Sequence, residues 1–231
     1  MITVGLRQRM VSDKKRQDHV DDSEGTVVSD RKHRVGIFGG TFHPIHYGHL
    51  IIAENACEQF DLEQVVFMPT GHAPHKAYGG PDMDRHRCRM VELAIADNPK
   101  FYISYREVRS DSVNYTYQTL RQLHDEFPDI AFYFILGADS LFDFHQWKHP
   151  ELICEEAVVL VAVRDDLNES RVDAQIRSLT LQLHGEIHRL NTPNFNISSK
   201  NIRERIQHGR SIRYLTPDPV VQYIRQNHLY R

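Results

Sequence analysis

Apolar and polar positions along this chain form a pattern that predicts short buried strands separated by helices. The segment 130–136 is apolar throughout and is followed by Gly137, which is typical of a buried strand that ends at a turn. Comparable runs place the expected strands at 35–38, 64–69, 101–104, 130–136, 157–163 and 186–190. Apolar residues at helical spacing predict helices at about 46–60, 84–96, 115–127, 169–181, 198–207 and 217–226.

The alternation of strands and helices indicates an α/β fold. Because the central strands are too apolar to have one face in water, we expect a parallel sheet covered on both sides. This architecture is a Rossmann-like, doubly wound parallel sheet, and such sheets bind ligands at the carboxyl ends of strands where the strand order reverses. The two most distinctive post-strand loops follow the first and fourth strands. If those strands are neighbours, both loops flank one crevice.

The first part of the chain has a different composition from the rest. Residues 1–33 mix basic residues such as Lys14-Lys15-Arg16 with Asp18, Asp21, Asp22 and Glu24, and show little apolar periodicity. Segments of this kind cannot bury enough apolar surface to fold alone. We therefore expect 1–33 to be a flexible extension and 34–231 to form one domain.

Composition narrows the function classes. The chain has 31 acidic and 28 basic residues among 231, a balance that argues against a general nucleic-acid binder. Its 15 histidines lack the Cys/His spacing of a metal site, and its three cysteines lie in mostly apolar segments, which indicates buried thiols in a reducing compartment. No run approaches the ~20 apolar residues of a membrane span, and no signal peptide is evident. We expect a cytoplasmic protein with neither membrane nor nucleic-acid partners; the sequence does not decide whether it forms a homo-oligomer.

The turn after the first strand carries the strongest chemical signal. Gly39 and Gly40 end the strand, and a helix begins near His46 to Gly48. Free backbone N–H groups and the positive end of a helix dipole then face one point, which is the usual arrangement of an anion site. His46 and His49 lie three residues apart at this helix start, and their imidazoles can donate hydrogen bonds to phosphate oxygens.

The string Gly39-Gly40-Thr41-Phe42-His43-Pro44-Ile45-His46-Tyr47-Gly48-His49-Leu50 resembles the motif of bacterial nicotinate-nucleotide adenylyltransferases, which belong to the nucleotidyltransferase superfamily marked by His/Thr-x-Gly-His. The resemblance runs from Arg34 to Arg231, although His43 stands where Asp or Asn is usual. It implies a nucleotidyltransferase-type fold that transfers the adenylyl group of ATP to nicotinate mononucleotide and yields deamido-NAD and pyrophosphate. The polyphosphate chemistry implies Mg²⁺ brought with ATP, and no carboxylate cage for it is visible in the sequence.

Carried over residue by residue, the resemblance implies catalytic roles for His46, His49, Lys76 and Arg203. The implied ATP contacts are Gly39, Gly40, Thr41, His46, His49, Gly137, Asp139, Ser198, Ser199 and Arg203. Taken alone, the segment from Ser198 to Arg203 would be a capped helix with a surface arginine. It resembles the family's Ile-Ser-Ser-Thr-x-Ile-Arg signature, which holds ATP phosphates, with Lys200 in place of the threonine.

The implied contacts to nicotinate mononucleotide are Thr41, Lys76, Tyr115, Thr116, Asp139 and Trp147. A lone tryptophan more often packs in a core, but the family stacks this position on the pyridine ring. Backbone N–H groups near Thr116 would receive the carboxylate, although Asn114 replaces the family's serine. Arg87 also matches a family position; it could equally be a helix-surface arginine, so we leave it out of the site.

Two other functions remain open from the sequence. One is a different nucleotidyltransferase of the same fold, acting on nicotinamide mononucleotide or phosphopantetheine; the phosphopantetheine reaction would leave the matches at Tyr115, Thr116 and Trp147 unexplained. The other is a non-catalytic nucleotide sensor, which the presence of His46, His49 and Arg203 disfavours.

Overall fold

The computed structural model describes residues 32–71, 80–110, 112–163, 169–193 and 196–231. The chain divides into the units Met1–Lys32 and His33–Arg231, and the account below concerns the second. Its strands are β1 (His33–Gly40), β2 (Gln64–Pro69), β3 (Phe101–Ile103), β4 (Ile130–Gly137), β5 (Val158–Ala162) and β6 (Ile187–Leu190). Its helices are α2 (Tyr47–Phe60), α3 (Gly80–Ile95), α4 (Thr116–Glu126), α5 (Ala138–Phe142), η1 (Phe144–Gln146), α6 (Pro150–Glu156), α7 (Glu169–Leu183), α8 (Ser199–Gln207) and α9 (Asp218–Gln226).

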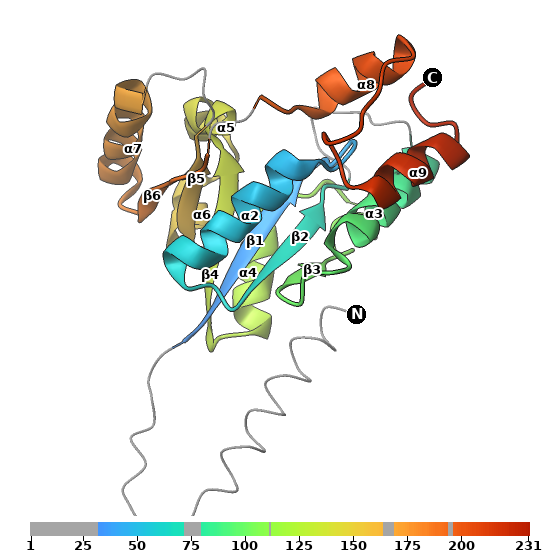
Figure 1. The fold of residues 1–231 in the computed structure, drawn as a ribbon. Helices are drawn as coiled ribbons and strands as arrows, with labels where there is room; N and C mark the ends of the chain where they lie inside the picture. Colours follow the sequence, from blue (N-terminus) through green and yellow to red (C-terminus); the bar gives the residue numbers. More distant parts are fainter. Residues whose placement is uncertain (1–31, 72–79, 111, 164–168, 194–195) are drawn as a thin grey trace, which may run out of the picture. The chain divides into compact units, whose positions relative to one another are not determined.

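Within the described residues the strands form one sheet in the order β3-β2-β1-β4-β5-β6, and every pair is parallel (Figure 1). The predicted α/β, doubly wound parallel fold is therefore confirmed. The order reverses between β1 and β4, so the condition that these two strands be neighbours is met. Phe38 pairs with Ile135, and each is followed two residues later by the last glycine of its strand. Gly40 and Gly137 consequently lie at the same level of the carboxyl edge.

Helices cover both faces of the sheet. Helix α2 packs against β1 and β2 on one face, while α4 contacts β4 and α6 contacts β5 on the other, where α4 and α6 also touch (Figure 1). The central strands are the most buried elements: all six residues of β2 are buried. This double burial explains why the central strands read as continuous apolar runs.

The C-terminal helix α9 packs against α3 through its apolar face, with Val220, Val221 and Ile224 buried. Cys57 and Cys88 are buried free thiols and Cys154 is half-buried, in agreement with the sequence expectation. Among the described residues, no helix has the length and apolar content needed to cross a bilayer.

Candidate active site

The loop between β1 and α2 is held from outside through its carbonyl oxygens. Four successive or near-successive carbonyls each accept a hydrogen bond from a side chain far away in the sequence. The pairs are Arg87 to Thr41 (2.6 Å), Arg203 to His43 (2.7 Å), Ser199 to Pro44 (2.8 Å) and Thr216 to Ile45 (2.8 Å). Because its carbonyls are anchored by α3, α8 and the segment before α9, the loop is a preorganised element at the carboxyl edge of the sheet.

His46 and His49 are stacked at the start of α2. Their ring centroids are 3.7 Å apart with an interplanar angle of 25°. His46 is the N-cap residue and is only 1% exposed, whereas His49 is half-buried. The backbone N–H of His46 donates to Nδ1 of His49 at 3.2 Å. Since Nδ1 acts as an acceptor, a neutral His49 carries its proton on Nε2, which makes that nitrogen a hydrogen-bond donor.

His43, where the family motif has Asp or Asn, packs its ring against Tyr230 with a centroid distance of 4.9 Å. Burial, reinforced by the positive charges of Arg203 and Arg87, lowers the pKa of His43 from 6.5 to about 4. His43 is therefore neutral at neutral pH. Its contribution to the loop is a packed ring and a carbonyl that accepts from Arg203.

Helix α8 joins the loop through two of the residues predicted to contact ATP. Ser198 is its N-cap residue, and its hydroxyl oxygen accepts the backbone N–H of Asn201 at 3.1 Å. Ser199 and Arg203 bind the loop carbonyls of Pro44 and His43. Arg203 is therefore half-buried against the loop between β1 and α2 (residues 41–46, the histidine loop) and does not lie on an ordinary solvated face. Lys200 is exposed, and its Nζ lies 3.9 Å from Oε1 of Glu204.

The start of α4 carries the predicted acceptor contacts Tyr115 and Thr116. Tyr115 is the N-cap residue with extended backbone, and Thr116 is the first helical residue. Trp147 lies beyond η1 and is half-buried; its ring centroid is 5.4 Å from that of Phe144 and 6.2 Å from that of Phe134. The indole thus has a packed side and an exposed part. Asp139 is exposed in the first turn of α5, two residues after Gly137.

Lys76 lies outside the described residues. Every other predicted site residue belongs to the carboxyl edge: to the end of β1 and the loop after it, the end of β4 with α5, the start of α4, the turn after η1, or α8 with its N-cap residue. The described residues contain no group of three or more His, Cys, Asp or Glu side chains able to hold a metal ion.

Arg87, which the sequence analysis left out of the site, is fully buried, so the alternative of a helix-surface arginine is wrong. Its guanidinium donates to the carbonyls of Thr41 and Thr70 and to the carboxylate of Asp84, each at 2.6 Å. It therefore ties the loop after β1 to the loop after β2. The burial of Arg87 could have been predicted from helical spacing, because position 87 shares a helix face with the buried Val91 and with position 94.

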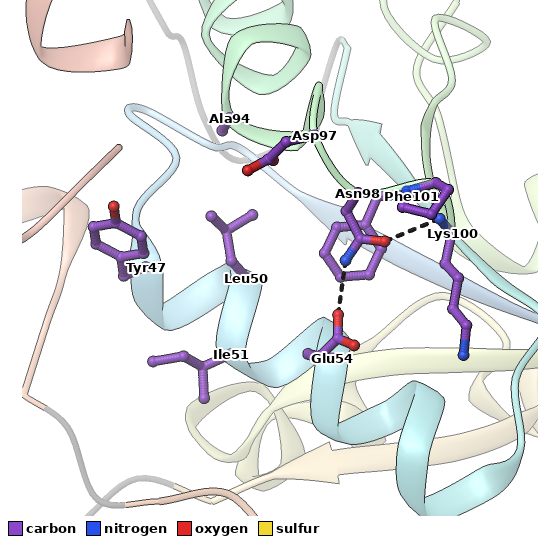
Figure 2. Close-up of a pocket in the computed structure, with 10 residues that line it drawn as sticks. Tyr47, Leu50, Ile51, Glu54, Ala94, Asp97, Asn98, Lys100 and Phe101 are labelled. Atoms are coloured by element: carbon purple, nitrogen blue, oxygen red, sulfur yellow. Dashed lines mark hydrogen bonds between the residues drawn. The ribbon is translucent and has the colours of Figure 1, made fainter. Parts of the chain in front are cut away.

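A hollow of about 580 Å³ lies apart from these groups, along α2 and beside the end of α3 (Figure 2). Tyr47 and Leu50 line it from α2, and Asn98 closes one side by donating to the carboxylate of Glu54 at 2.8 Å and accepting the backbone N–H of Lys100 at 2.9 Å. None of the predicted site residues that the structure describes lines this hollow.

With this geometry in place, comparisons with known proteins decide the family. Residues 37–205 match the family model described as cytidylyltransferase-like. A protein of Lachnoclostridium phytofermentans named "Probable nicotinate-nucleotide adenylyltransferase" is 41% identical over 197 residues, covering 85% of this chain and 98% of that relative. A protein of the same name from Synechococcus sp. (strain JA-3-3Ab) is 43% identical over 201 residues, covering 87% and 96%. The chain belongs to the nicotinate-nucleotide adenylyltransferase family.

Solved structures show the same fold for members of this family at lower identity. The nicotinic acid mononucleotide adenylyltransferase of Plasmodium falciparum complexed with NaAD superimposes with a TM-score of 0.70 at 21% identity, covering 86% of this chain and 97% of that one. The same enzyme complexed with APC has a TM-score of 0.67 at 20% identity, with the same coverage. The nucleotidyltransferase type of the fold, predicted from the motif, is thereby confirmed.

Proposed function

We propose that this chain transfers the adenylyl group of ATP to nicotinate mononucleotide, giving deamido-NAD and pyrophosphate. The proposal depends most on one observation: His46, His49 and Arg203 converge on a single anchored loop at the point where the strand order reverses. This is the donor set that two anionic substrates require. The names of the relatives and of the bound P. falciparum structure support the choice of substrates.

The reaction needs positioning and charge neutralisation more than covalent help. The phosphate of the acceptor nucleotide attacks the α-phosphorus of ATP, the new P–O bond forms, and the bond to pyrophosphate breaks in line. Nε2–H of His49 and the guanidinium of Arg203 would donate to the phosphate oxygens as their charge grows. Lys76, Ser198, Ser199 and the backbone of Gly39, Gly40 and Thr41 are proposed to complete this phosphate site. Mg²⁺ would enter with ATP and neutralise charge on the leaving pyrophosphate.

The acceptor is proposed to lie between α4 and α5. Backbone N–H groups at Tyr115 and Thr116, at the positive end of α4, suit the nicotinate carboxylate. The exposed part of Trp147 would stack on the pyridine ring, and Asp139 would accept hydrogen bonds from ribose hydroxyls. A carboxamide brings its own N–H₂ donors to a corner that already supplies donors, so we expect nicotinate mononucleotide to be preferred over the nicotinamide form.

Pyrophosphate release measured with ATP and Mg²⁺ tests the function directly. Nicotinate mononucleotide, nicotinamide mononucleotide and phosphopantetheine are supplied in turn as acceptors. Turnover with the first and at least tenfold lower kcat/KM with the second is the expected result. Release with phosphopantetheine alone would identify a different transferase, and binding of ATP without release from any acceptor would identify a nucleotide sensor. We further propose a cytoplasmic location; gel filtration would give the oligomeric state.

A further inference from the structure

Glu107 is a largely buried carboxylate that the proposed reaction does not use. It lies in the segment between β3 and α4, and its Oε1 accepts the hydroxyl proton of Thr119 at 3.1 Å. Its carboxylate also accepts the backbone N–H of Gly71. Burial raises the pKa of Glu107 from 4.5 to about 7, so placing this carboxyl here is unfavourable. Strongly shifted pKa values are common among residues of functional sites, so we looked for a functional role for the Glu107 carboxyl.

The contacts of Glu107 join two separate elements of the carboxyl edge. Thr119 lies in the first turn of α4, whereas Gly71 lies two residues after the end of β2. The approach at Gly71 is so close that a Cβ there would lie 2.0 Å from the carbonyl oxygen of Glu107. That same carbonyl accepts Nδ2 of Asn114 at 3.0 Å. Glu107 therefore fixes the start of α4 against the loop after β2 through side chain and backbone together.

This link continues the one made by Arg87. Arg87 binds the carbonyls of Thr41 and Thr70, and Thr70 is followed directly by Gly71. A continuous set of partly buried contacts thus runs from the histidine loop, through Arg87 and residues 70–71, to Glu107 and α4. The phosphate half and the acceptor half of the proposed site are positioned relative to each other by these two residues.

We propose that Glu107 is a positioning residue for the acceptor nucleotide: through Thr119 and Gly71 it sets the place of the backbone donors at Tyr115 and Thr116 that would receive the nicotinate carboxylate. This inference rests on the proposed function. Glu107 itself touches no substrate in this arrangement. Losing the link should therefore weaken use of the acceptor more than use of ATP, because the histidine loop and α8 retain their own contacts.

The test compares Glu107→Ala with Glu107→Gln. The glutamine can keep both contacts, since its amide oxygen accepts from Gly71 and its NH₂ donates to the Thr119 hydroxyl, which is also an acceptor. We expect Glu107→Ala to raise KM for nicotinate mononucleotide tenfold or more with KM for ATP changed less than twofold. Glu107→Gln should stay within threefold of wild type for both. Asp125→Ala, on the exposed side of α4, is the matched control and should change neither KM.

Thr119→Val is a second, independent variant that tests the same link if Glu107→Ala does not fold. It removes one of the two contacts, so KM for the acceptor should rise in the same direction, and calorimetric binding of nicotinate mononucleotide should weaken in parallel. Unchanged acceptor KM in both variants would overturn the inference, as would equal loss for both substrates, or Glu107→Gln behaving like Glu107→Ala. If the wild-type protein does not turn over nicotinate mononucleotide at all, the proposed function is wrong. This outcome is distinct from a failure of the inference about Glu107, because it is seen before any variant is compared.

Discussion

The buried carboxyl of Glu107 predicts a specific pH dependence of stability. Its pKa is 4.5 in an exposed chain and about 7 in the folded protein, because burial outweighs the hydrogen bonds from Thr119 and Gly71 that favour the charged form. The two values differ by about 2.5 pKa units, which at ~1.4 kcal/mol per unit is roughly 3 kcal/mol.

The sign follows from which state holds the proton. Below pH 4.5 the carboxyl is protonated in both the folded and the unfolded chain, so it adds no pH dependence. Between pH 4.5 and 7 the unfolded chain loses this proton while the folded chain keeps it, so rising pH favours unfolding. Above pH 7 the carboxyl is ionised in both states, and the full penalty of roughly 3 kcal/mol is present.

Urea denaturation of wild type and Glu107→Gln at pH 5 and pH 8 measures this contribution, with the fluorescence of the single tryptophan, Trp147, as the signal. Other titrating groups, including 15 histidines, are common to both proteins and cancel in the double difference. We expect Glu107→Gln to gain stability relative to wild type on going from pH 5 to pH 8, by roughly 2–3 kcal/mol. An equal difference at the two pH values would refute the reasoning, because the carboxyl would then not be desolvated in the folded protein.

Three further predictions concern the phosphate site and the N-terminal segment. His49→Ala should lower kcat by about a hundredfold or more with little change in melting temperature, and near-wild-type turnover would contradict a phosphate-facing donor. Arg203→Ala should raise KM for ATP more than KM for the acceptor in steady-state kinetics, while Arg203→Lys, which keeps the charge, should lose less; unaltered ATP kinetics in Arg203→Ala would remove it from the site. Deleting residues 1–32, which form a unit separate from His33–Arg231, should leave activity and melting temperature nearly unchanged, and a large fall in melting temperature would show that the segment packs on the domain.

The regular elements were predictable because each is a local pattern. The predicted strand at 64–69 agrees with β2 at both ends, and the predicted helix at 198–207 differs from α8 by one residue. Helix α3 begins at Gly80 rather than at position 84, in a stretch where polar residues hide the apolar spacing. The short helices α5 and α6 were not predicted, since five and seven residues hold too few turns for a periodic signal.

The candidate site was predictable where a motif covers its residues and not where long-range contacts bring residues together. His46, His49 and Arg203 were found from strings of residues, and the structure brings all three to one loop. Glu107 lies in an irregular segment whose sequence shows neither periodicity nor a special spacing. Its burial depends on contacts with Gly71 and with α4, which only the folded chain defines.

Long-range contacts also explain why the short His-x-Gly-His motif alone is weak evidence for the family, whereas the motif together with the C-terminal signature is strong evidence. The carbonyls of Pro44, His43 and Ile45 are bound by side chains 155, 160 and 171 residues further along the chain. A glycine turn with two histidines can occur in any chain, but without Ser199, Arg203 and Thr216 this loop would lose the hydrogen bonds to three of its carbonyls. The twelve-residue string and the C-terminal signature are therefore two halves of one structure. A variant that disturbs α8 should alter the histidine loop as well as the α8 residues that are proposed to contact ATP.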